Sequence, residues 1–199
     1  MESFLNLFVG YMDNGGFVMW PLFIANLFLW YGLGYRFLIL SRGRKKSVRI
    51  LIDNHIKKGP RKGVKGIIDE VIKDSIAMYN KTKHSPFVRD YIQDVQYKHY
   101  QEIKKYAVLV KIIIVIAPLT GLLGTVVGMI ETFDSLQSAA LFTQGGGIAG
   151  GISQALFTTQ LGLVVAVPGL ILGRILEKQQ HSLESEFEQV KDILSSKEG

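Results

Sequence analysis

Residues 117–133 read APLTGLLGTVVGMIETF, and residues 153–168 read SQALFTTQLGLVVAVP. Both stretches are almost free of charge, yet threonines, small residues and a proline stand where a simple membrane anchor would carry leucine. Small residues allow two helices to approach closely, and hydroxyl groups supply polar atoms inside a bilayer. The two stretches therefore predict a pair of closely packed membrane helices with a polar surface.

Hydrophobic residues make up 48% of the 199 positions and are concentrated in three blocks. Because a membrane helix needs about 20 apolar residues, we predict transmembrane helices at 17–40, 108–133 and 151–176. Residues 112–130 alone form an uncharged run of 19 residues. The expected fold class is an all-α membrane protein with three transmembrane helices.

The positively charged residues are distributed unevenly along the chain. Between residues 41 and 111 there are 18 Lys and Arg against 7 Asp and Glu, whereas residues 131–173 contain no Lys or Arg. Since segments rich in Lys and Arg stay on the cytoplasmic side, we expect the N-terminus in the periplasm and the C-terminus in the cytoplasm. The predicted segments are a periplasmic segment 1–16, a cytoplasmic helical domain 41–107, a short periplasmic loop 134–150 and a cytoplasmic C-terminal helix 177–199.

Membrane orientation also explains the net charge of +6, because the basic residues flank the predicted spans. Nucleic acid is therefore not expected as a partner, whereas contact with anionic lipid head groups is expected. Arg36, near the end of the first span, is expected to extend to the cytoplasmic interface. The chain has no cysteine and no nucleophile motif, and its histidines lack the spacing of metal ligands. We therefore expect no enzyme activity, no cofactor and no resident metal.

Two apolar stripes with helical spacing flank the second and third spans. The first consists of Val88, Ile92, Val95, His99, Ile103, Tyr106 and Val110, with no helix breaker among them. We therefore expect one continuous helix that runs from this stripe into the second span. The second stripe consists of Leu183, Phe187, Val190 and Leu194, and it predicts a helical extension after the third span. In water these apolar stripes must be covered by other helices. This requirement favours an oligomer.

The candidate functional residues of the second span are small or polar. Thr125 shares a helix face with Gly121 and Gly128, and Gly124 with Gly128 forms a small-xxx-small pair for close helix packing. Hydrogen bonding of the threonine hydroxyl to the carbonyl one turn earlier is the alternative to a functional role. Pro118 removes a backbone donor and can bend the helix.

The third span carries a similar set of residues. Thr159 and Gly162 lie on a stripe of small residues, with Gln154 and Thr158 one turn apart beside it. Amides and hydroxyls in hydrocarbon are costly unless they are paired, so together they favour a shared polar interior. Pro168 lies further along the same span and can bend it.

These two stretches resemble a known family. Residues 117–128 with Phe133, and residues 150–168, are similar to the corresponding helices of the MotA/TolQ/ExbB proton channel proteins. The likeness is close over residues 111–176, and three predicted spans rather than four make the chain similar to ExbB and TolQ proteins. Thr125 and Thr159 match the pore threonines of that family.

What the resemblance implies is a homopentamer in the bacterial inner membrane, with the second and third spans around a central pore. The pore would hold a dimer of a single-span ExbD-like or TolR-like partner, whose intramembrane aspartate takes up the ion. The complex would use the proton or sodium motive force to energise a TonB-like or TolA-like effector. ExbB and TolQ proteins usually have glutamate where this chain has Gln154.

The absence of that glutamate leaves three alternatives open. A proton relay needs ionisable groups, so the carboxylate must come from the partner or from Glu131, which is otherwise a solvated interface residue. Neutral oxygens, above all those of Thr125 and Thr159, could instead contact a transient Na⁺. The chain could also be a non-conducting membrane scaffold for a single-span partner.

Overall fold

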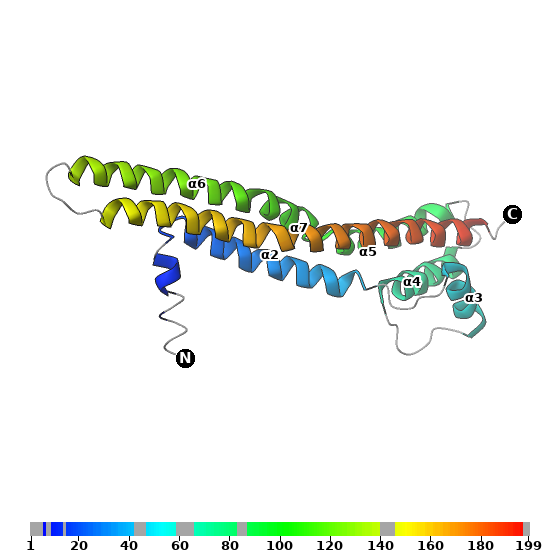
Figure 1. Ribbon diagram of the computed structural model, residues 1–199. Coiled ribbons are helices and arrows are strands. Elements are labelled where there is room, and N and C mark those ends of the chain that lie inside the picture. The colour runs from blue at the N-terminus through cyan, green and yellow to red at the C-terminus, as the bar shows by residue number, and fades with distance from the viewer. Residues whose placement is uncertain are drawn as a thin grey trace. The chain divides into compact units, whose positions relative to one another are not determined.

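The computed structural model describes residues 6, 9–13, 15–41, 47–58, 66–82, 87–139 and 146–196. The long elements in these ranges are all α-helices, and the ranges contain no β-strand (Figure 1). The helices are α2 (Met19–Ile39), α3 (Val48–Lys58), α4 (Ile67–Thr82), α5 (Val88–Lys104), α6 (Ala107–Ala139) and α7 (Gly146–Ser195). The expected all-α fold class is confirmed.

Three helical stretches of the described residues are long and apolar enough to cross a membrane, namely Met19–Ile39, Val88–Gln137 and Ile148–Ser195. Only 28%, 28% and 33% of their most apolar windows are buried inside the protomer. The prediction of three helices long and apolar enough to span a membrane is confirmed. Most of the surface of these windows must be covered by lipid or by other subunits, because exposed apolar surface is unfavourable in water.

The chain is organised in two compact units. Unit 1 consists of Met1–Leu33 and Leu109–Gly173, and it therefore holds most of α2, most of α6 and the first half of α7. Unit 2 consists of Gly34–Val108 and Arg174–Gly199, with α3, α4, α5 and the second half of α7. Part of the predicted segment 1–16 lies outside the described residues.

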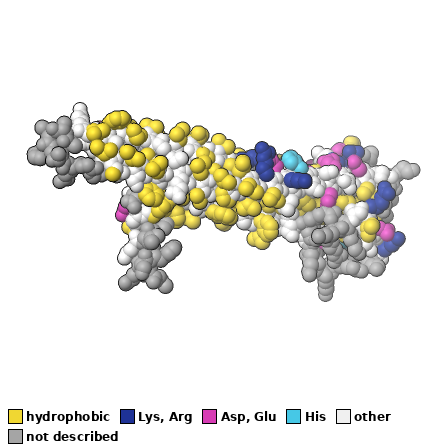
Figure 2. Space-filling model, in the orientation of Figure 1, with side chains coloured by type: hydrophobic (Ala, Val, Ile, Leu, Met, Phe, Trp, Pro, Cys, Tyr) yellow, Lys and Arg dark blue, Asp and Glu magenta, His cyan; other side chains and the backbone are white. Residues whose placement is uncertain are grey.

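Hydrophobic side chains cover the surface of unit 1 that is visible in Figure 2. Those that are at least half exposed on α6 and α7 include Leu119, Leu122, Leu123, Val126, Ile130, Leu156, Leu163 and Leu170. Apolar surface on this scale is typical of a lipid-facing or subunit-facing helix. Unit 1 accordingly has the surface expected of a membrane-embedded part.

Unit 2 has a core of its own, formed by α4, α5 and the second half of α7. Ile72 of α4, Ile92 of α5 and Phe187 of α7 are completely buried. The two predicted stripes supply a large part of this core, since Val88, Ile92, His99, Ile103, Leu183, Phe187, Val190 and Leu194 are all buried. The expected helical extension after the third span is therefore present as the end of α7.

The long helix expected before and within the second span is interrupted. It stops at Lys104 and resumes at Ala107, with Tyr106 between them at φ 59°, a left-handed conformation. The Tyr106 ring meets Tyr35 edge-on at 4.9 Å, and the Lys105 ammonium lies 5.2 Å and 5.3 Å from the Tyr35 and Tyr106 ring centroids. These contacts offset the cost of about 1–2 kcal/mol of a left-handed residue. The prediction of one continuous helix is wrong. The contact of Tyr106 with Tyr35 of α2 stabilises the break.

The predicted loop 134–150 is also shorter than expected. Helix α6 continues to Ala139 and α7 begins at Gly146, while residues 140–145 lie outside the described residues. Residues 131–139 contain neither Gly nor Pro, and Ser135 Oγ donates to the Glu131 carbonyl oxygen at 2.8 Å. Nothing in this stretch ends the helix where the apolar run ends, because loss of hydrophobicity is not a helix stop.

Arg36 does not extend to the surface as expected. Its residue surface is only 2% exposed, and Nη2 donates to Gln180 Oε1 at 2.6 Å within unit 2. Gln180 in turn donates from Nε2 to Glu184 Oε1 at 3.0 Å. A charged group leaves water only when hydrogen bonds replace its hydration, and here the amide of α7 supplies that bond.

Candidate functional site

Helices α6 and α7 run antiparallel in unit 1 and meet through glycines. Gly121 of α6 lies against Gly162 of α7, and Gly128 lies against Gly151. A Cβ on Gly128 would stand 2.6 Å from the Gly151 carbonyl oxygen, and one on Gly162 would stand 2.8 Å from the Ala117 carbonyl oxygen. Since these neighbours are backbone atoms, only glycine fits. We call this contact the glycine seam.

Thr158 lies inside the glycine seam and has no exposed surface. A Cβ on Gly124 would overlap its side chain. The Thr158 hydroxyl lies 3.2 Å from the Gln154 carbonyl oxygen and 3.0 Å from that of Ala155, so it bonds to its own helix. Thr158 therefore packs within the protomer, and its hydroxyl is not exposed on the surface of the helix pair.

Thr125 and Thr159 lie beside the seam, and both are half-buried. Thr125 Oγ1 donates to the Leu122 carbonyl oxygen at 2.6 Å. Thr159 Oγ1 lies 3.0 Å from the Ala155 carbonyl oxygen and 3.4 Å from that of Gly121, so it reaches both helices. Each hydroxyl proton is therefore engaged, while the oxygen lone pairs can still accept a hydrogen bond or contact a cation.

The two threonines lie on the same side of the helix pair. Thr125 follows Gly124, and Thr159 follows Thr158, so each is turned about 100° away from the seam on its own helix. Because the helices run antiparallel, equal turns along the chain direction point to the same side of the pair. We call this strip of hydroxyl groups the threonine flank. Most of the other exposed residues of α6 and α7 in unit 1 are apolar.

Gln154 and Glu131 lie together on the opposite side, which we call the glutamate flank. Gln154 Nε2 donates to Glu131 Oε1 at 3.1 Å. Gly16, in the turn before α2, packs against the Gln154 side chain, and the Tyr11 ring meets Phe157 edge-on at 5.1 Å. The predicted polar residues are therefore not one cluster, since the seam separates Gln154 and Glu131 from the two flanking threonines.

The two prolines lie inside continuous helices, Pro118 in α6 and Pro168 in α7. Each removes one backbone N–H, so the carbonyl four residues earlier loses its usual helical donor. Thr120 Oγ1 donates to the Ile116 carbonyl oxygen at 3.0 Å next to Pro118. Neither helix ends at its proline, so these residues are compatible with the long membrane helices.

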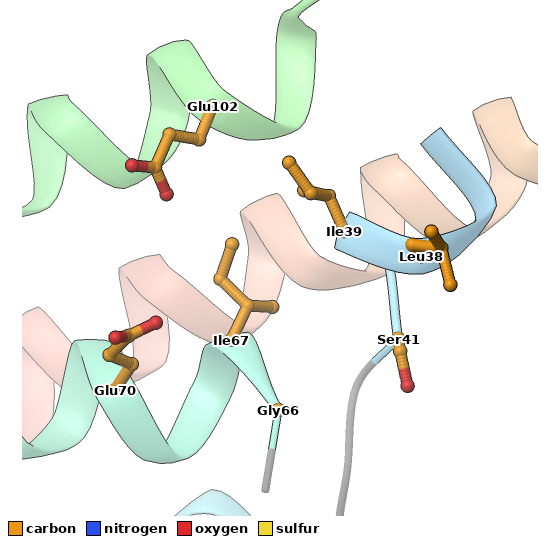
Figure 3. A pocket seen from close by; sticks show the side chains of 7 residues that line it. All are labelled: Leu38, Ile39, Ser41, Gly66, Ile67, Glu70 and Glu102. Atoms are coloured by element: carbon orange, nitrogen blue, oxygen red, sulfur yellow. The ribbon is translucent and has the colours of Figure 1, made fainter. Parts of the chain in front are cut away.

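A recess of about 380 Å³ lies in unit 2 (Figure 3). It is lined by Leu38, Ile39, Ser41, Gly66, Ile67, Glu70 and Glu102. Glu70 stands in the first turn of α4, where the helix dipole favours an acid, and Glu102 Oε2 lies 3.8 Å from His99 Nδ1. Local structure accounts for both carboxylates, so the recess is not the principal candidate site. The sequence analysis did not single it out.

The described residues contain no group of three or more His, Asp or Glu side chains that could hold a metal ion. Sequence reasoning also missed Gly151 and the pairing of Glu131 with Gln154. Gly151 stands four residues before Ala155, so the small-xxx-small spacing could have revealed it. The pairing across two helices leaves no comparable signal. The helix pair α6 and α7, with its two polar flanks, is the candidate site.

Comparison with known proteins agrees with this geometry. The sequence profile described as the MotA/TolQ/ExbB proton channel family matches residues 63–189, a range that includes all of α6 and most of α7. The chain belongs to the MotA/TolQ/ExbB family. Family membership and the three apolar helices together identify the chain as a membrane protein.

Relatives with curated names are ExbB-like members of this family. The chain is 38% identical over 74 residues to the ExbB-like biopolymer transport protein 3 of Synechocystis. The matched stretch covers 37% of this chain and 35% of the relative. It is 40% identical over 68 residues to biopolymer transport protein exbB1 of Vibrio cholerae, and this match covers 34% of this chain and 30% of the relative. It is 33% identical over 123 residues to an ExbB-like protein 1 of Helicobacter pylori, covering 60% and 65%. The match spans about a third of the length of the first two relatives.

Proposed function

We propose that the chain is the ion-conducting stator subunit of an ExbB–ExbD-like motor in the bacterial inner membrane. The motor uses the proton motive force to energise a TonB-like or Tol-like process of the cell envelope. Membership of the MotA/TolQ/ExbB family and the ExbB-like names of the relatives support this proposal. Sodium is the alternative ion, since hydroxyl oxygens suit a hard cation.

The observation that carries the proposal is the threonine flank. Thr125 and Thr159 are half-buried hydroxyls on one side of a helix pair whose other exposed residues are mostly apolar. Polar groups in membrane helices are costly and usually line a path or an interface. The glycine seam holds both threonines in place, because it fixes the two helix backbones against each other.

The proposed assembly is a homopentamer around a dimer of a single-span ExbD-like or TolR-like partner that carries an intramembrane aspartate. About 70% of the apolar windows of α6 and α7 is not buried within the protomer, so neighbouring copies and lipid must cover it. A single helix pair also cannot enclose a path. The TonB-like or TolA-like effector would bind to this complex.

We propose that the N-terminus lies in the periplasm and the C-terminus in the cytoplasm. Unit 1 contains a single basic residue, Lys111, whereas most other Lys and Arg residues fall in unit 2. The proposed segments remain a periplasmic 1–16, spans at 17–40, 108–133 and 151–176, and cytoplasmic 41–107 and 177–199. Each elementary charge that crosses the membrane releases about 2.3 kcal/mol per 100 mV, which would drive the motion.

The test is reconstitution with the partner. The chain is co-expressed with the single-span protein, the complex is purified, and ion flux is measured in liposomes with an imposed membrane potential. Flux that requires both proteins supports the proposal. Binding of the partner without flux supports the scaffold alternative. Replacement of Na⁺ by K⁺ at constant pH distinguishes the ions, because a sodium motor loses its activity and a proton motor does not.

A further inference from the structure

The carboxylate of Glu131 is exposed and belongs to a unit that has almost no positive charge. Unit 1 contains one basic residue, Lys111, which lies 20 residues earlier on the same helix. At 1.5 Å per residue the two are about 30 Å apart, too far for Lys111 to balance the charge. The other carboxylates among the described residues of unit 1 are Asp13 and Asp134, which have the same sign.

The hydrogen-bond partner of Glu131 is a neutral amide, not a cation. Gln154 Nε2 donates to Glu131 Oε1 at 3.1 Å. An amide satisfies both protonation states of a carboxyl group, because its N–H donates to the anion and its oxygen accepts from the neutral acid. A lysine or arginine at this position would hold the anion permanently. The pair is therefore suited to bind and release a proton without leaving an unpaired polar group.

The N-terminal turn keeps Gln154 in position. Gly16 has φ 64°, and a Cβ there would stand 2.9 Å from Gln154 Cδ and closer still to Nε2. The edge-on contact of Tyr11 with Phe157 places the segment before α2 along the same stretch of α7. The turn thus limits the directions in which the Gln154 amide can point, and one of them faces Glu131.

We infer that Glu131 is the proton-binding group of the protomer and that Gln154 is its positioning residue. A proton from the aqueous phase at this end of α6 binds the Glu131 carboxylate, which becomes a neutral acid. The proton then leaves to water on the glutamate flank, and the carboxylate is restored. This inference rests on the proposed function and assigns to it the ion and the ionisable residue of the channel subunit.

The experiment compares variants of the complex reconstituted with its single-span partner, using a pH-sensitive dye inside the liposomes. Glu131→Gln keeps the size of the side chain and an acceptor for Gln154, but it cannot take up a proton. We expect proton flux to fall by about a hundredfold, the lower end of the effect of a positioned acid–base group. The double variant Glu131→Gln with Gln154→Glu moves the carboxylate across the same hydrogen bond, and we expect it to recover most of the flux.

Asp134→Asn is the matched control, since it removes the same charge three residues further along α6. We expect its flux to stay within about twofold of the unmodified chain. The inference is overturned if Glu131→Gln conducts normally, because a purely structural bond survives that change. It is also overturned if the double variant assembles but remains inactive.

Failure of the proposed function gives a different result, namely no flux in the unmodified complex. The infrared absorption of protonated carboxyl groups then still tests the inference. A carboxyl band that appears as the pH is lowered, and that is missing in Glu131→Gln but present in Asp134→Asn, supports proton binding by Glu131. An unchanged band in Glu131→Gln rules it out.

Discussion

The carbonyl oxygen of Gly151 stands where a side chain on Gly128 would begin. The distance from an ideal Cβ on Gly128 to this oxygen is 2.6 Å, and the backbone nitrogen of Ala155 is only 2.9 Å away. Helices α6 and α7 therefore touch at the level of their main chains. Four predictions follow from this and from the other contacts described above.

Gly128→Ala should destabilise unit 1. The added methyl group meets backbone atoms that cannot rotate away, and such overpacking typically costs about 1–3 kcal/mol. Gly150→Ala is the matched control, because a Cβ at Gly150 meets nothing within 4 Å. Alanine is a better helix former than glycine by about 1 kcal/mol, so the control should be neutral or slightly stabilising. Thermal unfolding of the detergent-solubilised protein measures both. Equal melting temperatures would mean that the seam is looser than described.

Thr159→Val should abolish energised function while leaving assembly intact. Valine keeps the shape of threonine but removes the hydroxyl that lies between the Ala155 and Gly121 carbonyl oxygens. Thr159→Ser restores a hydroxyl and should restore function. Thr158→Ser, in the seam, should affect stability rather than flux. The measurements are co-purification with the partner and ion flux in liposomes. Normal flux in Thr159→Val would show that this threonine only packs.

Tyr106→Gly should be more stable than Tyr106→Ala, the reverse of the usual order in helices. Both variants lose the ring contact with Tyr35, so the comparison isolates the backbone. Glycine adopts φ 59° without strain, whereas alanine bears a cost of about 1–2 kcal/mol in a left-handed conformation. Chemical unfolding of the two variants measures the difference. If alanine proves the more stable residue, α5 and α6 join into one helix when the ring is removed.

Arg36→Met should destabilise unit 2. The change removes the donor to Gln180 Oε1 and leaves a buried amide oxygen unpaired, which typically costs about 1–3 kcal/mol. Arg174→Met is the control, because the Arg174 side chain is 77% exposed and its pairing with Glu177 contributes little. The midpoint of denaturant unfolding should fall in the first variant and stay unchanged in the second. A similar midpoint for both would mean that Gln180 finds another donor.

The sequence predicted those features that depend on periodicity along a single helix. The three spans and the stripes that include Ile92 and Phe187 were expected, and the structure contains them, because burial of one helix face leaves a repeat of three to four residues. Features that depend on a contact between distant segments were missed. The break at Tyr106 and the burial of Arg36 both require partners on another helix, Tyr35 and Gln180, which no local pattern reveals.

The candidate site was predicted as a set of residues but not as an arrangement. The composition of the two spans indicated Thr125, Thr158, Thr159 and Gln154 as one polar group. The structure divides them, since Thr158 lies in the seam and Gln154 lies with Glu131 on the opposite flank. Helical spacing fixes the angle between residues on one helix. Only the contact between α6 and α7 shows which of these residues face the other helix.

The main-chain contact between α6 and α7 also limits how the proposed motor could do work. A screw motion of α6 by one residue, with its rotation of about 100°, would bring Leu122 to the position of Gly121 or Leu123 to that of Gly124, where there is no room for a larger side chain. The two helices must therefore move together as one rigid helix pair. In the proposed assembly, any movement driven by an ion would have to occur between neighbouring helix pairs, or between a helix pair and the proposed single-span partner.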